Sequence, residues 1–168
     1  MLGSSRELHA KLGDQAGLAA VLMVPIQAEA GILFPPDGYL AAVSKVWTDN
    51  NVLLIWDEIQ TGFCRTGKKF AWQHDDAEPD MICLGKALGG GLMPVAAVAG
   101  KKEVLSVFKP GDHGSTFGGN PLACVIGLAA MQDMDDQKLA ENSAKMGAKL
   151  IDAFKASKND WIEEVRGR

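Results

Sequence analysis

Four apolar runs along the chain lack the alternation of polar and apolar residues that marks a half-buried strand. Uninterrupted runs of this kind are typical of strands covered on both faces of a sheet. They occupy residues 18–27 (up to Pro25), 52–56, 81–85 and 95–100.

Three other segments show the apolar spacing of helices. Residues 35–51 open with Pro-Pro-Asp and place Leu40, Val43 and Trp47 on one side of a helix. Residues 121–134 and 136–157 have the pattern of two further helices. Buried strands that alternate with helices predict an α/β protein with a mostly parallel sheet and flanking helices.

Polar residues follow two of the predicted strands directly. "DEIQTG" (57–62) comes after the run 52–56, and "GKALGGG" (85–91) ends the run 81–85. In parallel sheets, ligands bind beyond the carboxyl ends of the strands. The order of elements therefore gives both segments a position where a binding site is expected.

Composition narrows the class of protein. The chain has 168 residues, of which 47% are hydrophobic and 23% charged, as in soluble globular domains. The net charge is −4 without a basic run, and no apolar stretch reaches the length of about 18 residues of a membrane span. The three cysteines and three histidines lack the spacings of disulfide frameworks and metal sites. We therefore expect a cytoplasmic protein that binds neither nucleic acid, membrane nor metal.

Lys86 is a candidate nucleophile because it ends an apolar run just before the glycines at 89–91. The segment matches neither a Walker phosphate loop nor a GxGxxG dinucleotide loop. Burial near the sheet would favour the neutral amine, and backbone without side chains would let a flat ring approach it. Taken alone, Lys86 is also compatible with a surface lysine at a strand end.

Two further clusters add an acid and two hydroxyls. Asp57 and Glu58 follow an apolar run, where a buried carboxylate that stays ionised needs a cation. Ser115 and Thr116 lie in a glycine-rich loop, where hydroxyls and free N–H groups suit an anion such as phosphate. Each cluster alone also fits a structural cap or turn. Together with Lys86 they describe a ligand with a carbonyl, a basic ring nitrogen and a phosphate, which is pyridoxal phosphate.

The segments that hold these residues are similar to a known family. "LLIWDEIQTGFCRTGKKFA", "PDMICLGKALGGGLMPVAAV" and "PGDHGSTFGGNPLAC" resemble the class III pyridoxal-phosphate-dependent aminotransferases in sequence, order and spacing, from about Leu18 to Arg168. Within the class, "PIQAEAG", "EIQTG", "KALGGG" and "EEVRGR" are most similar to the ornithine aminotransferases. The resemblance implies the C-terminal half of an aspartate-aminotransferase-like large domain (PLP fold type I). Residues 1–135 would belong to this cofactor domain, and residues 136–168 would form a helix and the start of a small domain.

The same resemblance implies roles for individual residues. Lys86 would form the Schiff base with the cofactor and move the proton during the reaction. Asp57 would pair with the pyridinium nitrogen, and Gln60 would hydrogen-bond the phenolic oxygen of the ring. Thr116, together with Ser115, would bind the phosphate of the cofactor held by the neighbouring subunit of a homodimer.

Substrate choice is implied in the same way. Glu29, in "QAEAG", matches a glutamate that pairs with a substrate-binding arginine and influences which amino group reacts. The implied reaction transfers the δ-amino group of L-ornithine to 2-oxoglutarate and gives glutamate semialdehyde and glutamate. The alternatives are acetylornithine or another ω-amino acid as the substrate, and an inactive fragment that acts only as a dimerisation module. Because such enzymes are normally more than twice this length, we expect weak cofactor binding and no appreciable turnover by this chain alone.

Overall fold

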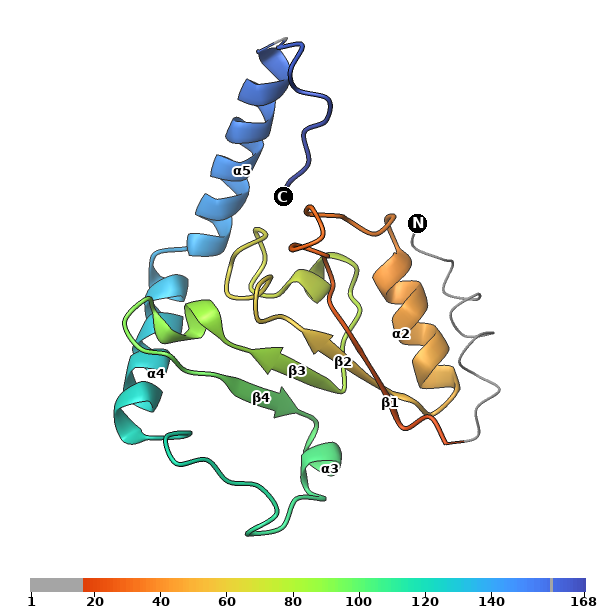
Figure 1. The fold of residues 1–168 in the computed structure, drawn as a ribbon, viewed down its shortest axis with the longest axis vertical. Helices are drawn as coiled ribbons and strands as arrows, with labels where there is room; N and C mark the ends of the chain where they lie inside the picture. Colours follow the sequence, from red (N-terminus) through yellow and green to blue (C-terminus); the bar gives the residue numbers. More distant parts are fainter. Residues whose placement is uncertain (1–16, 158) are drawn as a thin grey trace.

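In a computed structural model, which describes residues 17–157 and 159–168, the chain is built around a four-stranded sheet (Figure 1). The strands, in their order across the sheet, are β1 (Ala20–Met23), β2 (Leu53–Asp57), β3 (Met81–Leu84) and β4 (Ala97–Gly100). The first three run parallel, and β4 pairs antiparallel with β3. Each strand lies within a predicted apolar run, and the mostly parallel sheet is confirmed.

The three predicted helices are present, with ends that differ by a few residues from the predicted ones. Short helical turns join the strands where the sequence shows no helical periodicity. The helical elements are α2 (Tyr39–Asp49), η1 (Ala71–His74), η2 (Lys86–Gly89), α3 (Lys102–Leu105), α4 (Pro121–Asp136) and α5 (Leu139–Ala156). Asn120 caps α4, because its Oδ1 accepts a hydrogen bond from the Ala123 N–H at 2.9 Å.

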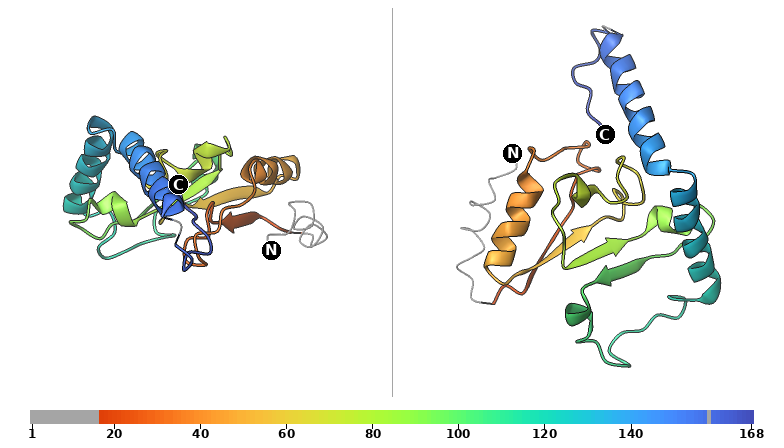
Figure 2. Two further views of the ribbon diagram at one scale, coloured as in Figure 1. Left: turned by 90° about the horizontal axis from the view of Figure 1, so that it is seen from above. Right: turned by 180° about the vertical axis from the view of Figure 1, so that it is seen from behind.

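The hydrophobic core lies between α2 and the sheet. Leu40, Val43 and Trp47, the residues whose spacing predicted the helix, are all buried on α2. They pack with Leu54 and Trp56 of β2, so α2 covers one face of the sheet (Figure 2). This burial fixes which side chains of β2 face α2, and the parallel pairing of β1, β2 and β3 places the polar residues that follow β2 and β3 at one edge of the sheet.

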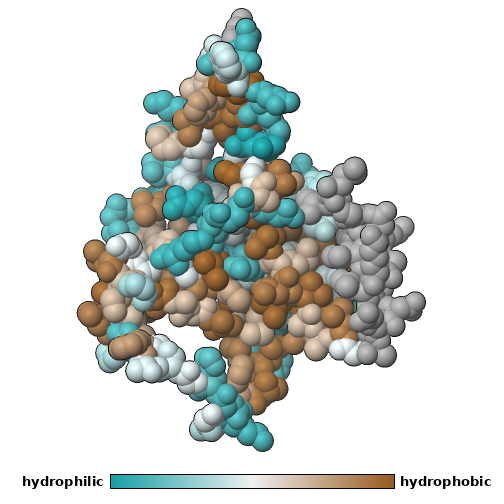
Figure 3. Space-filling view, in the orientation of Figure 1, coloured by the Kyte–Doolittle hydropathy of each residue, from teal (hydrophilic) through white to brown (hydrophobic). Residues whose placement is uncertain are grey.

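The other face of the sheet is only partly covered. Leu53 and Ile55, which alternate with the buried residues of β2, remain half-buried, and Leu22 of β1 is exposed. All four residues of β4 are exposed. Apolar side chains consequently gather over this part of the surface and over α4 (Figure 3). The expectation that the strands are covered on both faces is therefore wrong for this chain, because side chains on the second face stay exposed or half-buried.

The end of the chain extends away from the sheet. Lys138, with φ of 53°, separates α4 from α5, and α5 projects from the body of the molecule (Figure 1). Residues 159–168 return alongside α5, where a Cβ added at Gly147 would lie 3.2 Å from the backbone of Arg168. The expected domain division between residues 135 and 136 stays a prediction. Among the described residues, no helix is long and apolar enough to span a membrane.

Candidate active site

The turn after β3 holds Lys86 in an unusual backbone conformation. Lys86 begins η2 with φ of 44°, in the left-handed region that non-glycine residues rarely occupy. Such a conformation costs about 1–3 kcal/mol and is concentrated at functional sites. The hydrogen bond from the Leu88 N–H to the Gly85 carbonyl, 3.0 Å long, closes the turn around it. Lys86 therefore lies at the carboxyl edge of the sheet, and its backbone conformation is fixed by the turn.

The glycines after Lys86 are explained by backbone conformation and packing. Gly90 and Gly91 have φ of 59° and 76°, which glycine adopts without strain. A Cβ on Gly90 would lie 3.2 Å from the Ala130 side chain of α4. These glycines therefore bring the turn against α4, a reason different from the expected space for a flat ring.

Of the two carboxylates at the end of β2, Glu58 is the buried one. Its side chain is completely inaccessible and accepts hydrogen bonds from Thr61 Oγ1 at 2.5 Å and from the Trp72 N–H at 2.9 Å. Burial raises the pKa of Glu58, and these hydrogen bonds oppose the rise. The buried carboxylate of this pair is therefore Glu58 and not Asp57, the residue proposed to face the cofactor. Alternation along β2 signals this arrangement, because Glu58 lies two residues after buried Trp56.

Asp57 is half-buried instead and keeps one oxygen available. Its Oδ1 accepts a hydrogen bond from the Ile59 N–H at 3.0 Å, which fixes the carboxylate. Oδ2 makes no hydrogen bond within residues 17–157 and 159–168. The carboxylate is thus both oriented and open to a ligand.

Glu29, Gln60 and Lys86 form a chain of hydrogen bonds. Lys86 Nζ donates to Gln60 Oε1, and Gln60 Nε2 donates to Glu29 Oε1 at 3.0 Å. An ammonium can only donate and an ionised carboxylate can only accept, so the two partners together fix which end of the Gln60 amide faces Lys86. All three residues are exposed, and the burial that was expected of Lys86 is not found.

One cavity brings together four of the predicted site residues. Its volume is about 450 Å³, and its lining includes Glu29, Asp57, Gln60 and Lys86. A cavity of this size lies in the usual range for small-molecule sites, about 300–1,000 Å³. Because Asp57 and Lys86 line the same cavity, the residues fit a ring placed between an amine and an acid.

The two predicted phosphate ligands lie elsewhere. Ser115 and Thr116 are exposed in the loop between α3 and α4, beyond the β4 edge of the sheet (Figure 1). Ser115 Oγ accepts a hydrogen bond from the Gly118 N–H at 2.9 Å. Neither residue lines the cavity that contains Lys86. Within a single chain, therefore, the structure does not bring the hydroxyls to the lysine.

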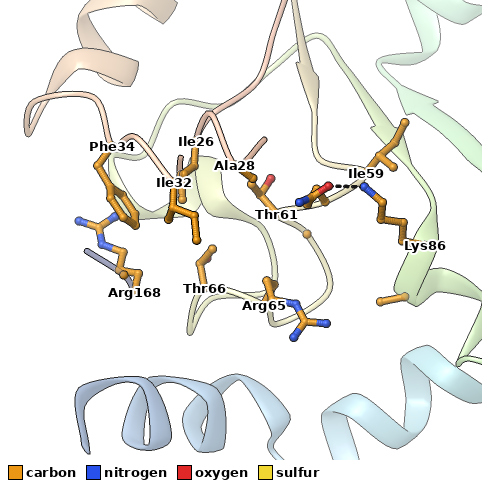
Figure 4. Close-up of a pocket in the computed structure, with 14 residues that line it drawn as sticks. Ile26, Ala28, Ile32, Phe34, Ile59, Thr61, Arg65, Thr66, Lys86 and Arg168 are labelled. Atoms are coloured by element: carbon orange, nitrogen blue, oxygen red, sulfur yellow. Dashed lines mark hydrogen bonds between the residues drawn. The ribbon is translucent and has the colours of Figure 1, made fainter. Parts of the chain in front are cut away.

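A second cavity adjoins Lys86 and contains residues that the sequence analysis did not single out. It has a volume of about 460 Å³ and includes Arg65 and Arg168 along with Gln60 and Lys86 (Figure 4). Arg65 follows β2 in a loop, and no pattern in the sequence marks it as a residue that lines a cavity.

Sequence comparison places the chain beside known enzymes. A profile of the family described as Aminotransferase class-III matches residues 4–168. The ornithine aminotransferase of Brevibacillus brevis is 53% identical over 150 residues, which is 89% of this chain and 38% of that protein. The chain thus spans about two fifths of the length of the curated relatives that it matches.

Comparison with solved structures also finds aminotransferases. The ornithine aminotransferase of Toxoplasma gondii, whose structure reveals partial occupancy of PLP at its active site, superposes with a TM-score of 0.93 at 45% identity. The alignment covers 98% of this chain and 39% of that one. The acetylornithine aminotransferase of Elizabethkingia anophelis gives a TM-score of 0.93 at 46% identity, covering 98% of this chain and 42% of that one.

Proposed function

The chain belongs to the class-III aminotransferases, a family of pyridoxal-phosphate-dependent transaminases, and from this premise we propose that it serves the transamination of L-ornithine. Its fold is the expected part of the PLP fold type I large domain. The proposed reaction transfers the δ-amino group of ornithine to 2-oxoglutarate and gives glutamate semialdehyde and glutamate. Its main support is that Lys86 and Asp57 line one cavity on the carboxyl side of β2 and β3.

The residues of this cavity are proposed to hold pyridoxal phosphate. When bound, the cofactor supplies an aldehyde that takes up amino groups and a ring that accepts electrons. Asp57 would keep a proton on the ring nitrogen, since Ile59 fixes its Oδ1 and leaves Oδ2 open. Gln60 would contact the phenolic oxygen, and its amide is already oriented by Glu29.

Lys86 is proposed as the group that takes and returns the substrate proton. Its Nζ is directed into the site by the hydrogen bond to Gln60 Oε1, and its left-handed backbone is fixed by the turn after β3. A base must come within hydrogen-bond reach of the carbon that it deprotonates. Glu29, two hydrogen bonds away from Lys86, would influence the substrate through this chain of contacts.

A homodimer is part of the proposal. Ser115 and Thr116 are exposed and lie away from the Lys86 cavity of their own chain, which agrees with phosphate binding in a neighbouring subunit. A cytoplasmic location is proposed as well, and its support is that Cys64, Cys83 and Cys124 are free thiols.

The first experiment identifies the reactive lysine. The purified protein is mixed with pyridoxal phosphate, the imine absorbance is recorded, and the product is reduced with borohydride and mapped by mass spectrometry. We expect the label on Lys86, and we expect Lys86→Ala to lose both absorbance and label. Lys68→Ala is the matched control, because Lys68 is exposed and lines neither cavity at Lys86. A label on any other lysine would refute the assignment.

A second measurement separates the two substrate candidates. Ornithine and N-acetylornithine are compared as amino donors in single-turnover reactions at saturating pyridoxal phosphate, which follow the loss of the imine absorbance and need no sustained turnover by this chain. Faster reaction of ornithine is expected, since relatives with that activity in their names reach 53% identity. Preference for N-acetylornithine would instead favour the activity named for the E. anophelis neighbour, which is 46% identical.

A further inference from the structure

The cavity of about 460 Å³ beside Lys86 has an unbalanced charge. Three cationic residues, Arg65, Lys86 and Arg168, contribute to its lining, and no Asp or Glu among the described residues does. The apolar part of the wall is formed by side chains such as Ile26, Ile32 and Phe34. Positive side-chain charge in an apolar-walled cavity attracts anions, because field lines concentrate in such clefts.

The carboxylates near Lys86 line a different cavity. Glu29 and Asp57 both line the neighbouring cavity of about 450 Å³, which shares Gln60 and Lys86 with the cationic one. The reactive amine thus stands between an acidic region and a cationic region. A substrate that carries its own negative charge away from the reacting atom would extend into the cationic region.

Arg65 is the cation of this cavity that is available to a ligand. Within the described ranges, neither a hydrogen bond nor an ion pair involves its guanidinium. Lys86 is engaged by Gln60, and the Arg168 guanidinium lies over the Phe34 ring, 5.8 Å from its centroid. Figure 4 shows Arg65 between Lys86 and Arg168.

The backbone of Arg65 is held in place although its side chain is not. Its carbonyl accepts a hydrogen bond from Ser143 Oγ of α5 at 2.9 Å. The next residue, Thr66, is buried, and its Oγ1 lies 3.0 Å from His74 Nε2. On the other side, Cys64 is buried with φ of 68°. A fixed backbone lowers the entropy that is lost when the side chain binds a ligand.

We propose that Arg65 binds a carboxylate of the amino-acid and 2-oxo-acid substrates, at the end of the substrate that lies away from the reacting atom. The planar guanidinium can make two parallel hydrogen bonds to a carboxylate, and the apolar walls strengthen them. The assignment rests on the proposed function, because it takes Lys86 as the point of reaction. Ornithine and 2-oxoglutarate both carry a carboxylate, so Arg65 serves both halves of the reaction.

A structural role is the alternative against which this proposal is tested. Arg65 also lines a cavity of about 630 Å³ beneath α4, where Asp133 is the acidic residue. Asp133 Oδ1 accepts a hydrogen bond from Gln137 Nε2 at 2.6 Å. If Arg65 served chiefly to balance Asp133, removing either charge would lower thermal stability without affecting ligand affinity of the folded protein.

The experiment measures binding of glutarate by calorimetry, with glutaramide as the uncharged comparison. Glutarate has two carboxylates but no amino or oxo group, so it binds without reacting. Arg65→Met is expected to weaken glutarate binding about 10- to 100-fold, the size expected for lost charge-assisted hydrogen bonds. Arg65→Lys is expected to weaken it about threefold to tenfold, because the charge stays and the planar fork is lost. Lys68→Met removes a nearby charge that lines neither cavity at Lys86 and should leave glutarate affinity unchanged.

The measurements are made with and without pyridoxal phosphate, and each is paired with the imine absorbance and a melting curve. Absence of an imine in the wild type counts against the proposed function, whereas glutarate binding to the cofactor-free protein still tests Arg65. The proposal is overturned if Arg65→Met binds glutarate as the wild type does, or if only Arg168→Met weakens binding. It is also overturned if Arg65→Met and Asp133→Asn lower the melting temperature alike while folded protein keeps its affinity.

Discussion

At the scale of single residues, Glu58 stabilises the loop that follows β2 and carries Gln60. Its side chain is completely inaccessible. Its oxygens accept hydrogen bonds from Thr61 Oγ1 and from the Trp72 N–H, close to Asp57 and Gln60 in the sequence. Burial raises the pKa of Glu58, the hydrogen bonds from Thr61 and Trp72 lower it, and the charge of Asp57 adds a smaller rise. The net shift of the pKa is upward, so Glu58 keeps its proton to a higher pH in the folded protein than in the unfolded chain.

This shift predicts a pH dependence that Glu58→Gln removes. An unfolded glutamate has a pKa of about 4.3. The stabilisation of the folded state by protonated Glu58 is complete below that value and is lost as pH rises through the higher folded-state pKa. The free energy of unfolding of Glu58→Gln, relative to wild type, should therefore increase as pH rises from about 4 towards 7. Urea unfolding across this range is the measurement.

Two further variants test whether Glu58 is the source of this pH dependence. Glu58→Ala should lose about 1–3 kcal/mol, because it leaves the Trp72 N–H without its acceptor. Glu103→Gln changes an exposed carboxyl on α3 and should follow the wild-type pH profile. Parallel profiles for wild type and Glu58→Gln would show that Glu58 is not the source of the dependence.

Part of the cavity that holds the candidate site was predictable from the sequence. Lys86 and Asp57 were predictable because polar residues that end apolar runs reach the carboxyl edge of a parallel sheet. Arg65 was not, since an arginine in a loop has no pattern until the fold shows what its side chain faces. The amide orientation of Gln60 likewise depends on Glu29, 31 residues away in the chain.

At the scale of elements, Asp80 joins three strands. It precedes β3, its Oδ2 accepts the Leu54 N–H of β2 at 2.8 Å, and its Oδ1 accepts Lys101 Nζ, which follows β4, at 2.8 Å. Burial by itself would raise the pKa of Asp80, but the hydrogen bonds from Lys101 and Leu54 outweigh it and lower the pKa.

Asp80→Asn is therefore expected to destabilise the sheet by about 1–3 kcal/mol at neutral pH, since a charged acceptor of two hydrogen bonds is lost. A lowered folded-state pKa contributes stability that is present above the unfolded value, about 3.9, and is lost as pH falls through the folded-state pKa. The difference between Asp80→Asn and wild type should thus shrink below about pH 4 in urea unfolding.

An exposed ion pair provides the control for this change. Lys45 and Asp49, 2.9 Å apart on α2, are both exposed. Replacing Lys45 with Met should cost no more than about 0.5 kcal/mol, because water screens such pairs. Equal losses for Lys45→Met and Asp80→Asn would contradict the role of Asp80.

The positions of the strands and helices in the sequence were predictable, but the direction of the strands and the elements that cover the sheet were only partly predictable. Apolar runs located all four strands, and apolar periodicity located α2, α4 and α5. The antiparallel direction of β4 depends on how the chain turns after β3, which periodicity does not encode. Single-turn elements such as η2 are too short to show a repeat. The uncovered second face of the sheet could not be read from the runs, because strand composition does not say which element covers it.

At the scale of the whole molecule, large apolar residues remain on the surface. Leu122, Val125 and Leu128 of α4 are exposed by 61%, 63% and 64%, and Phe117 in the preceding loop by 80%. This surface adjoins the loop that carries Ser115 and Thr116 (Figure 3). Contiguous apolar surface of this kind favours association.

Replacing Leu128 with Glu is expected to weaken the proposed homodimer, because a charge would be placed among apolar neighbours. Analytical ultracentrifugation over a concentration series measures the effect. Asn142→Glu on exposed α5 adds the same charge outside the α4 surface and should associate as the wild type does. An unchanged dissociation constant for Leu128→Glu would exclude this part of α4 from the interface.

The backbone at Lys86 also says something about how the residue came to be there. A left-handed φ of 44° is a conformation that glycine or asparagine would adopt with less cost than lysine. Selection for stability alone would therefore replace this side chain. The proposed role of its amine in the reaction would account for a lysine at this position, because the function would offset the cost to the stability of the fold.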